Sequence, residues 1–447
     1  MRGGNVVTPQ GVRQADIAIS DGRIQAIAPD LPAAASEIDA RGLFIFPGLI
    51  DVHVHFNEPG RTDWEGAASG SRALAAAGGT LFFDMPLNST PCTINARAFN
   101  QKCDALKAAS ITDFALWGGL VPGNVGEMEE LATRGVVGFK AFLCDSGLPE
   151  FPRADDLTLF EGLLEAARLG LPVAVHAESQ EITAALSRRT SEQGRTTVRD
   201  FLASRPVVAE LEAIQRATFL AGEARAKLHI VHVSSGRGVA VAAEARTRGV
   251  DVSIETCSHY LSFTEEDVER LGAIAKCAPP LRGRDEQSAL WAALLNGTVD
   301  IVASDHSPAP PDLKSGDFFG AWGGIAGVQS TLSVLLEQGH HRRGLPLEQI
   351  ATLLGATPAR RFRIANKGSI TPGNDADLAL VDLGRPFLLE RADLLQRHRL
   401  SPYVGSEFRG TLVRTIRRGE TIFSSGSITA QTMGELVRPC SAQTSLA

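Results

Sequence analysis

The sequence has few of the features that mark disulfide-stabilised or membrane-spanning proteins. It contains six cysteines in 447 residues, and none of them forms a C-x-x-C pair. Sparse cysteines without this spacing are typical of proteins kept in a reducing compartment, so we expect free thiols rather than a disulfide framework. No apolar stretch reaches the roughly 18 residues that a transmembrane helix needs, and the first residues lack the apolar segment of a signal peptide. We therefore expect a soluble, cytoplasmic protein.

Long blocks of one charge are absent as well. The chain has 44 Lys and Arg against 51 Asp and Glu, which gives a net charge of -7. Nothing in this balance favours binding to nucleic acid or to an acidic membrane surface. A small-molecule substrate is the better expectation.

Two kinds of hydrophobic pattern divide the chain into three segments. Residues 1–46 alternate apolar and polar positions around the Asp21-Gly22 turn, which predicts a half-exposed β-hairpin. Residues 47–366 contain eight nearly continuous apolar runs separated by helical stretches, the pattern of buried parallel strands. Residues 367–447 return to short strands and turns. We expect an α/β protein with a TIM-like (β/α)₈ barrel and a small β-sandwich domain formed by both termini, and we expect the chain after about Ile428 to fray.

Histidines and an aspartate follow several of the apolar runs. The period-2 alternation of a strand places His53 and His55 on one face of the first run, His176 and His232 follow later runs, and Asp305 follows the last. The carboxyl ends of barrel strands meet at one face of the barrel, where active sites lie. Neutral imidazole and carboxylate are ligands that suit zinc and related divalent ions. One histidine alone is more often structural, but this set together predicts a metal site.

Two further residues of these runs call for separate interpretations. Lys140 lies inside an apolar segment, where loss of water penalises the ammonium form. It either reaches the barrel mouth or an acidic partner, or it is a neutral amine that takes up carbon dioxide and becomes a carbamate bridging two cations. His229 is out of register with His232, and we expect it to pack outside the barrel.

Several segments outside the ligand set occur together in one family. They are Asn57–Arg61, Trp64–Gly66, Asp84–Asn88, Gly138–Lys140, Ser304–Pro308 and Ala321–Gly327. With the H-x-H pair, they resemble the cyclic amidases of the amidohydrolase superfamily, and among these most of all the allantoinases, over almost the whole chain. The resemblance implies a hydrolase of purine catabolism that opens the hydantoin ring of allantoin to allantoate.

The resemblance also implies two divalent metal ions, zinc by family precedent. The first would be held by His53, His55, carbamylated Lys140 (N6-carboxylysine) and Asp305, and the second by Lys140, His176 and His232. A hydroxide shared by the two ions would attack the ring carbonyl, while Asp305 accepts its proton and passes it to the leaving ring nitrogen. A homotetramer is implied in the same way.

Substrate contacts are expected from four residues of these segments. Bacterial dihydroorotases usually carry an arginine at the position of Asn57, where a guanidinium suits a carboxylate, whereas a neutral amide matches the uncharged ureido and ring amides of allantoin. His259 is expected to contact the substrate or to orient the ligands, with a purely structural role equally open. Asn88 and Ser307 are weaker candidates.

Three other functions remain open at this point. The chain is alternatively a dihydroorotase, or a hydantoinase or dihydropyrimidinase, although these last two generally lack the Glu58-Pro59-Gly60-Arg61 and Met85-Pro86-Leu87-Asn88 segments. The alternative from a different class of function is a non-catalytic dihydropyrimidinase-like assembly protein. Such proteins typically lose metal ligands, and this sequence retains the full set.

Overall fold

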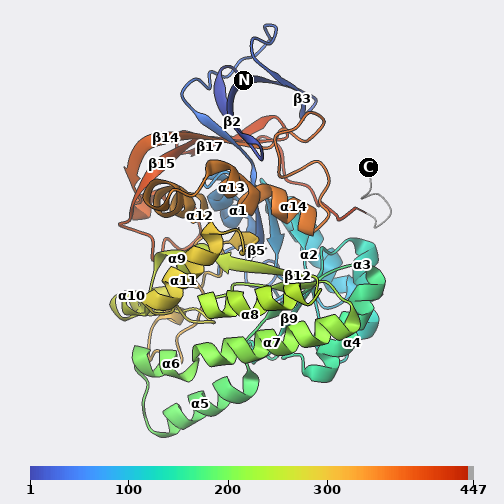
Figure 1. Cartoon of the computed structure of the whole chain (residues 1–447), viewed down its shortest axis with the longest axis vertical. Coiled ribbons are helices and arrows are strands. Elements are labelled where there is room, and N and C mark those ends of the chain that lie inside the picture. Colours follow the sequence, from blue (N-terminus) through green and yellow to red (C-terminus); the bar gives the residue numbers. More distant parts are fainter. Residues whose placement is uncertain (441–447) are drawn as a thin grey trace.

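A parallel β-barrel occupies the middle of the chain in the computed structural model, which describes residues 1–440 (Figure 1). The barrel strands are β5 (Leu49–Val54), β6 (Gly79–Asp84), β7 (Asp113–Leu116), β8 (Gly118–Gly119), β9 (Phe139–Phe142), β10 (Val173–His176), β11 (Leu228–Ile230), β12 (Val252–Cys257) and β13 (Ile301–Ala303). Trp117 separates β7 from β8, so these two are pieces of one barrel strand. The predicted eight-stranded barrel is confirmed.

The barrel closes beside the sequence segments that carry the predicted metal ligands. The sheet β5-β6-β7 continues into the sheet β8 to β13 through β8, which pairs in parallel with β9. At the other edge, Val54 forms a parallel bridge with His306, and the backbone N–H of His55 donates to the carbonyl of His306 over 2.8 Å. The seam of the barrel therefore lies between the His53/His55 strand and the Asp305 loop.

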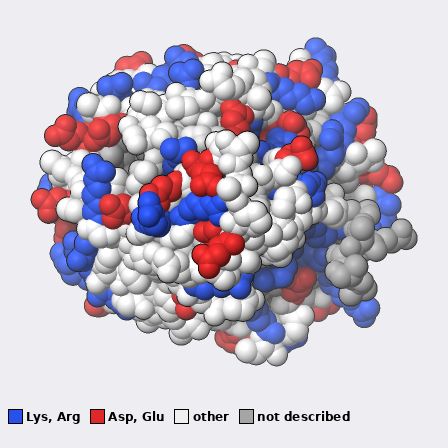
Figure 2. All heavy atoms as spheres, turned by 90° about the horizontal axis from the view of Figure 1, so that it is seen from above, with Lys and Arg blue, Asp and Glu red and all other residues white. Residues whose placement is uncertain are grey.

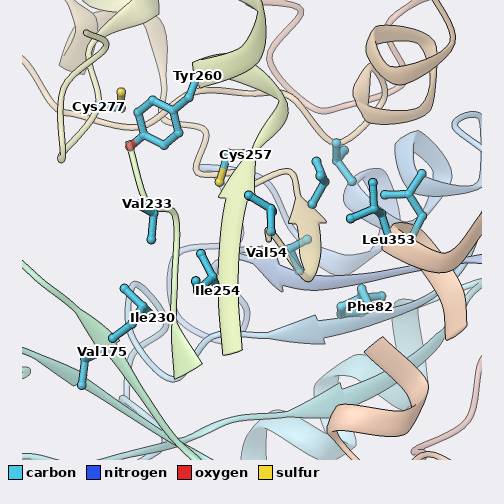
Figure 3. Packing of buried hydrophobic residues seen from close by; sticks show 14 of the residues in the cluster. Val54, Phe82, Val175, Ile230, Val233, Ile254, Cys257, Tyr260, Cys277 and Leu353 are labelled. Atoms are coloured by element: carbon cyan, nitrogen blue, oxygen red, sulfur yellow. The ribbon is translucent and has the colours of Figure 1, made fainter. Parts of the chain in front are cut away.

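Helices cover the outside of the barrel. They are α1 (Ala67–Ala75), α2 (Ala96–Ala109), α3 (Met128–Arg134), α4 (Asp156–Leu169), α5 (Gln180–Glu192), α6 (Val198–Ser204), α7 (Val207–Ala224), α8 (Gly236–Thr247), α9 (Ser258–Ser262), α10 (Glu265–Leu271), α11 (Arg284–Leu295), α12 (Thr331–Val334), α13 (Leu347–Ala351) and α14 (Thr357–Arg361). Helix α7 buries Ala213, Ala217 and Ala221, a stripe with a spacing of four residues that faces the core. Outward-facing residues of neighbouring strands, such as Val175, Ile230 and Ile254, lie in the same packed layer (Figure 3).

A second apolar cluster fills the barrel itself. It is built from the alternate strand residues, including Val52, Phe83 and Trp117, and from Phe362, which follows α14. The Phe362 ring lies 5.2 Å from the ring centres of both Phe83 and Trp117. The barrel interior is thus a packed core below the residues at the strand ends.

Both ends of the chain form one mostly antiparallel sheet next to the barrel. Its order is β17-β16-β15-β14-β4-β1-β2-β3. The strands are β1 (Gly4–Thr8), β2 (Gly11–Ser20), β3 (Arg23–Ala28), β4 (Phe44–Pro47), β14 (Leu378–Leu388), β15 (Glu407–Arg417), β16 (Glu420–Ser424) and β17 (Ser427–Ile428). Ile17, Ile45, Leu378 and Ile416 lie in a core of their own. The predicted α/β class, with a β domain from both termini, is confirmed.

The C-terminal segment after β17 lies along the barrel instead of fraying. The backbone N–H of Phe114 in β7 donates to Glu435 over 3.0 Å, and the N–H of Val437 donates back to Phe114 over 2.8 Å. The N–H of Cys440 is bonded to the carbonyl of Arg363. Buried backbone groups of β7 need these partners. The predicted fraying is therefore wrong for residues 428–440, and residues 441–447 lie outside the described part.

The outer surface carries charges of both signs. Seen from the end that bears the terminal sheet, basic and acidic side chains are mixed among uncharged ones (Figure 2). Within residues 1–440, no helix is both long and apolar enough to cross a membrane.

Candidate active site

Three of the predicted ligands converge at the barrel seam. His53 is in β5, His55 follows it, and Asp305 follows β13. Oδ1 of Asp305 lies 3.2 Å from Nε2 of His53 and 3.4 Å from Nε2 of His55. Burial raises the pKa of Asp305, but the imidazole of His53 and a hydrogen bond from His55 outweigh it and hold this pKa well below its usual value. The carboxylate is therefore in the form that binds a cation.

Two more imidazoles meet beside this group. His176 ends β10 and His232 follows β11, and Nδ1 of His176 lies 3.0 Å from Nε2 of His232. The ring centres of His53 and His232 are 5.4 Å apart, which joins the two groups. Burial and then the neighbouring Lys140 lower the pKa of His232 well below its usual value, so this imidazole is neutral. Neutral imidazole is the ligand form.

The backbone at two of these positions is unusual. His232 has a φ of 40° and Asp305 a φ of 43°, in the left-handed region that residues other than glycine rarely adopt. Such conformations persist only where the surrounding structure imposes them, and they concentrate at functional sites. Each one turns a side chain toward the site directly after a strand ends.

Lys140 lies in β9 and is completely buried. Its Nζ has no hydrogen-bond partner among the described residues, and it lies 5.0 Å from the centre of the Phe142 ring. Burial lowers the pKa of Lys140 to about 8, although Asp305 and Glu255 oppose this shift. A buried polar atom without a partner is rare in folded proteins, and this one lies among metal-ligand side chains. The donor set thus fits divalent ions such as zinc, and Nζ of Lys140 is among its nitrogens that have no partner.

Two buried glutamates, which the sequence analysis missed, hold these histidines in place. Oε1 of Glu255 lies 2.8 Å from Nδ1 of His53 and accepts the backbone N–H of His232, while Oε2 of Glu178 lies 2.9 Å from Nε2 of His176. Burial raises the pKa of Glu255, but His53 and His229 outweigh it and lower this pKa to about 2. Carboxylates in these positions fix the tautomer and orientation of metal-ligating imidazoles.

Both glutamates had a signal in the sequence. Glu255 follows Ser253 at period 2 and alternates with the apolar Val252 and Ile254, which places it on the face that points into the barrel. Glu178 comes two residues after His176. A search for carboxylates near each candidate ligand would have found them.

His229 packs inside the barrel, so the prediction that it lies outside is wrong. Its Nε2 is 2.9 Å from Oε2 of Glu255, and its ring stacks on Trp117 with ring centres 6.3 Å apart. The prediction assumed a regular strand up to His232. Strand β11 ends at Ile230 and the backbone then changes conformation, so the two histidines do not follow one alternation.

A cavity of about 400 Å³ opens over this cluster. Its lining includes five predicted ligands, His53, His55, His176, His232 and Asp305, and two predicted substrate contacts, Asn88 and Ser307. Nδ2 of Asn88 lies 3.5 Å from Oγ of Ser307. Volume and mixed lining suit a small polar molecule.

The other two predicted substrate contacts do not reach the cavity. Asn57 is buried, and its Nδ2 faces the carbonyl oxygen of Pro308 at 3.4 Å. His259 is completely buried close to Asp305, and burial lowers its pKa to about 4. Neither residue is part of the cavity lining in this structure, and their contact with the substrate stays a prediction.

Known proteins resemble this chain over nearly its whole length. A family model described as "Amidohydrolase family" matches residues 44–422. The allantoinase of Solibacter usitatus (strain Ellin6076) is 67% identical over 440 residues, covering 98% of this chain and 96% of that protein. The allantoinase of Rubrobacter xylanophilus is 60% identical over 441 residues, covering 98% and 97%. Among solved structures, the L-hydantoinase (dihydropyrimidinase) from Arthrobacter aurescens matches with a TM-score of 0.95 and 34% identity over 98% of both chains.

Proposed function

Because the chain belongs to the amidohydrolase family, we propose that it hydrolyses the hydantoin ring of allantoin to allantoate. One observation carries the proposal. The ligand-type side chains at the barrel mouth surround a single cavity in a chain 67% identical to an allantoinase. The predicted amidohydrolase resemblance, and with it the assignment to a hydrolase, is confirmed.

The proposed cofactor is a pair of divalent ions, zinc in the first instance. His53, His55, Lys140 and Asp305 would hold one ion, and Lys140, His176 and His232 the other. The partnerless Nζ of Lys140 and the facing nitrogens of His176 and His232 support this assignment. A depressed pKa leaves more of the Lys140 amine neutral, the form that reacts with carbon dioxide to give N6-carboxylysine.

Different side chains of the site have different roles in the proposed reaction. When bound, divalent ions polarise a carbonyl and lower the pKa of a water molecule. Asp305, through its Oδ1, accepts the proton of the attacking water and returns it to the ring nitrogen that leaves. Glu255 and Glu178 keep the imidazoles of His53 and His176 oriented. Asn88 and Ser307 offer the amide and hydroxyl that bind the polar substrate.

Two alternative enzyme activities differ from the proposed one in their substrate. The structural match to an L-hydantoinase favours hydantoin as the second candidate, and dihydroorotate is the third. We would incubate zinc-loaded and metal-free protein with allantoin, hydantoin and dihydroorotate and follow ring opening by proton NMR. Metal-dependent turnover of allantoin supports the proposal, and turnover of hydantoin alone overturns it. Protein that neither binds metal nor turns over any of the three is the non-catalytic assembly protein.

We also propose a homotetramer in the cytoplasm. Leu157 and Leu164 on α4 and Val208 and Phe219 on α7 are exposed apolar side chains on neighbouring helices, a feature that subunit contacts explain. The six cysteines are free thiols, which suits a reducing compartment. Light scattering on the purified protein tests the assembly.

A further inference from the structure

One wall of the active-site cavity is a glycine-containing loop. Residues 319–324, with the sequence Phe-Gly-Ala-Trp-Gly-Gly, all belong to the cavity lining. No strand or helix covers this stretch, so its backbone carbonyls have no partners from regular secondary structure. Backbone carbonyls that are turned inward need donors from elsewhere.

Lys276 supplies donors to the first half of the loop. Its Nζ donates to the carbonyl of Phe319 over 3.0 Å and to the carbonyl of Ala321. The amine lies over the Phe201 ring, 4.8 Å from the ring centre, which is a favourable position for an ammonium group. The carbonyl of Lys276 accepts the backbone N–H of Gly324 over 2.7 Å. Lys276 alone therefore binds three backbone groups of the loop.

Lys314 supplies donors to the second half. Its Nζ donates to the carbonyl of Trp322 over 3.0 Å and to the carbonyl of Gly324 over 2.6 Å. The backbone N–H of Trp322 donates over 2.7 Å to the carbonyl of Leu313, the residue before Lys314. Four loop carbonyls are thus bound by two amines.

The loop is joined at its far end to the segment after β13 that carries Asp305. The carbonyl of Ile325 accepts the backbone N–H of Ser307 over 2.9 Å, and Ile325 forms a bridge with His306. Gly324 has a φ of 129°, and a Cβ atom at this position would lie 2.2 Å from the carbonyl oxygen of Ser307. The two lysines therefore fix a wall that is continuous with the Asp305 segment.

We propose that Lys276 and Lys314 are positioning residues that hold the loop of residues 319–324 as a fixed wall of the cavity and thereby set substrate affinity. This inference rests on the proposed function for its substrate, but not for its geometry. Burial lowers the pKa of Lys276 to about 8 and that of Lys314 to about 7. A neutral amine keeps two N–H donors, so either protonation state holds two carbonyls.

The test uses Lys276→Met and Lys314→Met, which keep the length of the side chain and remove its donors. Lys107→Met, at an exposed position of α2, is the matched control, and Lys276→Arg restores donors. We expect amide hydrogen exchange of the peptide containing residues 318–325 to become faster in both methionine variants of the zinc-loaded protein. With allantoin, KM should rise about tenfold while kcat changes by less than about threefold, since a lost pair of hydrogen bonds weakens binding without touching the reacting atoms. Lys276→Arg should recover part of the affinity.

Three results would overturn the inference. The first is loop exchange in both variants equal to that of Lys107→Met. The second is faster exchange across the whole barrel, which means a general loss of stability. The third is a lower kcat at unchanged KM. If the wild type does not turn over allantoin, the proposed function fails, and the exchange data still decide whether the lysines hold the loop.

Discussion

Two lysines of this molecule are buried in opposite surroundings. Lys367, at the base of the barrel, lies 3.0 Å from Asp113, 3.0 Å from Asp375 and 2.6 Å from Asp377. Burial lowers its pKa, but the three carboxylates outweigh this and raise it well above the usual value. Lys140, at the mouth, has no hydrogen-bond partner within residues 1–440, and its pKa falls to about 8. One lysine side chain is thus paired with three carboxylates, whereas the other has no hydrogen-bond partner.

The difference separates structural charge from functional charge. At the base, Arg418 also bonds Asp113 over 2.5 Å, so each buried charge meets a partner from another segment of the chain. Such a network fixes how the terminal sheet sits on the barrel. At the mouth, the groups remain incompletely satisfied because the chain supplies only part of the partners. For Lys140, which lies among ligand-type side chains, the missing partner is therefore a sign of a ligand site.

The largest effect is expected from removing the open lysine. Lys140→Ala should lower kcat/KM for allantoin at least about a thousandfold, because it removes the ligand proposed to join both ions and their polarising effect is worth several kcal/mol. Short carboxylic acids such as acetate should restore part of the activity by standing in for the carbamate. Steady-state assays with and without acetate measure both. Activity equal to wild type would remove Lys140 from the mechanism.

Removing Lys367, the lysine paired with carboxylates, should lower the free energy of unfolding rather than the activity. Lys367→Met leaves the buried Asp377 and the half-buried Asp375 without their cation, while Asp113 keeps Arg418, and breaking a buried pair costs about 3–5 kcal/mol. We expect urea unfolding to show this loss, while kcat/KM of the folded variant stays near wild type. Lys107→Met should change neither quantity. A Lys367→Met protein that is stable but inactive would contradict the contrast between base and mouth.

A smaller effect is expected from the carboxylate behind His53. Glu255→Gln should weaken metal binding by about 10- to 100-fold, the usual effect of losing such an orienting partner. Competition with a chelator, monitored as bound zinc, measures it. Glu210→Gln is the matched control, because Glu210 is an equally buried carboxylate that bonds Ser234 and Ser235 rather than an imidazole. Equal metal affinity in both variants would assign Glu255 to packing alone.

The smallest expected effect is the change with pH in the stability that Lys367 contributes. Because the folded pKa of Lys367 is raised, its contribution to stability is complete below the unfolded value of about 10.4 and is lost only as the pH rises through the higher folded value. The difference in unfolding free energy between wild type and Lys367→Met should therefore stay constant from about pH 6 to about pH 9. Urea titrations at several pH values test this. A difference that shrinks across this interval would mean that Lys367 is not held by its aspartates.

The parts of the molecule that follow from local pattern could be predicted from the sequence. Eight apolar runs predicted eight barrel strands, and histidines that follow strands gave a ring of candidate ligands around one cavity. Lys140 stood out because a charged residue in an apolar strand needs an explanation. These inferences need only side-chain alternation and the common direction of parallel strands.

The remainder depends on local backbone geometry that composition does not reveal. The left-handed backbone at His232 breaks the register on which the place of His229 was inferred. Asn57 was assigned to the substrate because of its residue type, whereas in the structure its side chain faces the carbonyl of Pro308 and is not part of the cavity lining. The C-terminal segment has no periodic pattern because isolated backbone bonds hold it to separate parts of the chain, such as Phe114 in β7 and Arg363.

The terminal sheet has a consequence for how the protein is made. Strand β4 lies between β1 and β14, with Ile45 paired to Val6 on one side and to Leu380 on the other. While the ribosome is still synthesising the barrel, β4 has an open edge whose partner has not yet been translated. Open strand edges are the sites where nascent chains pair with one another. Completion of this fold therefore waits for release of the last residues, and a chain truncated before β14 would be a target for chaperones and proteases even though its whole barrel had been made.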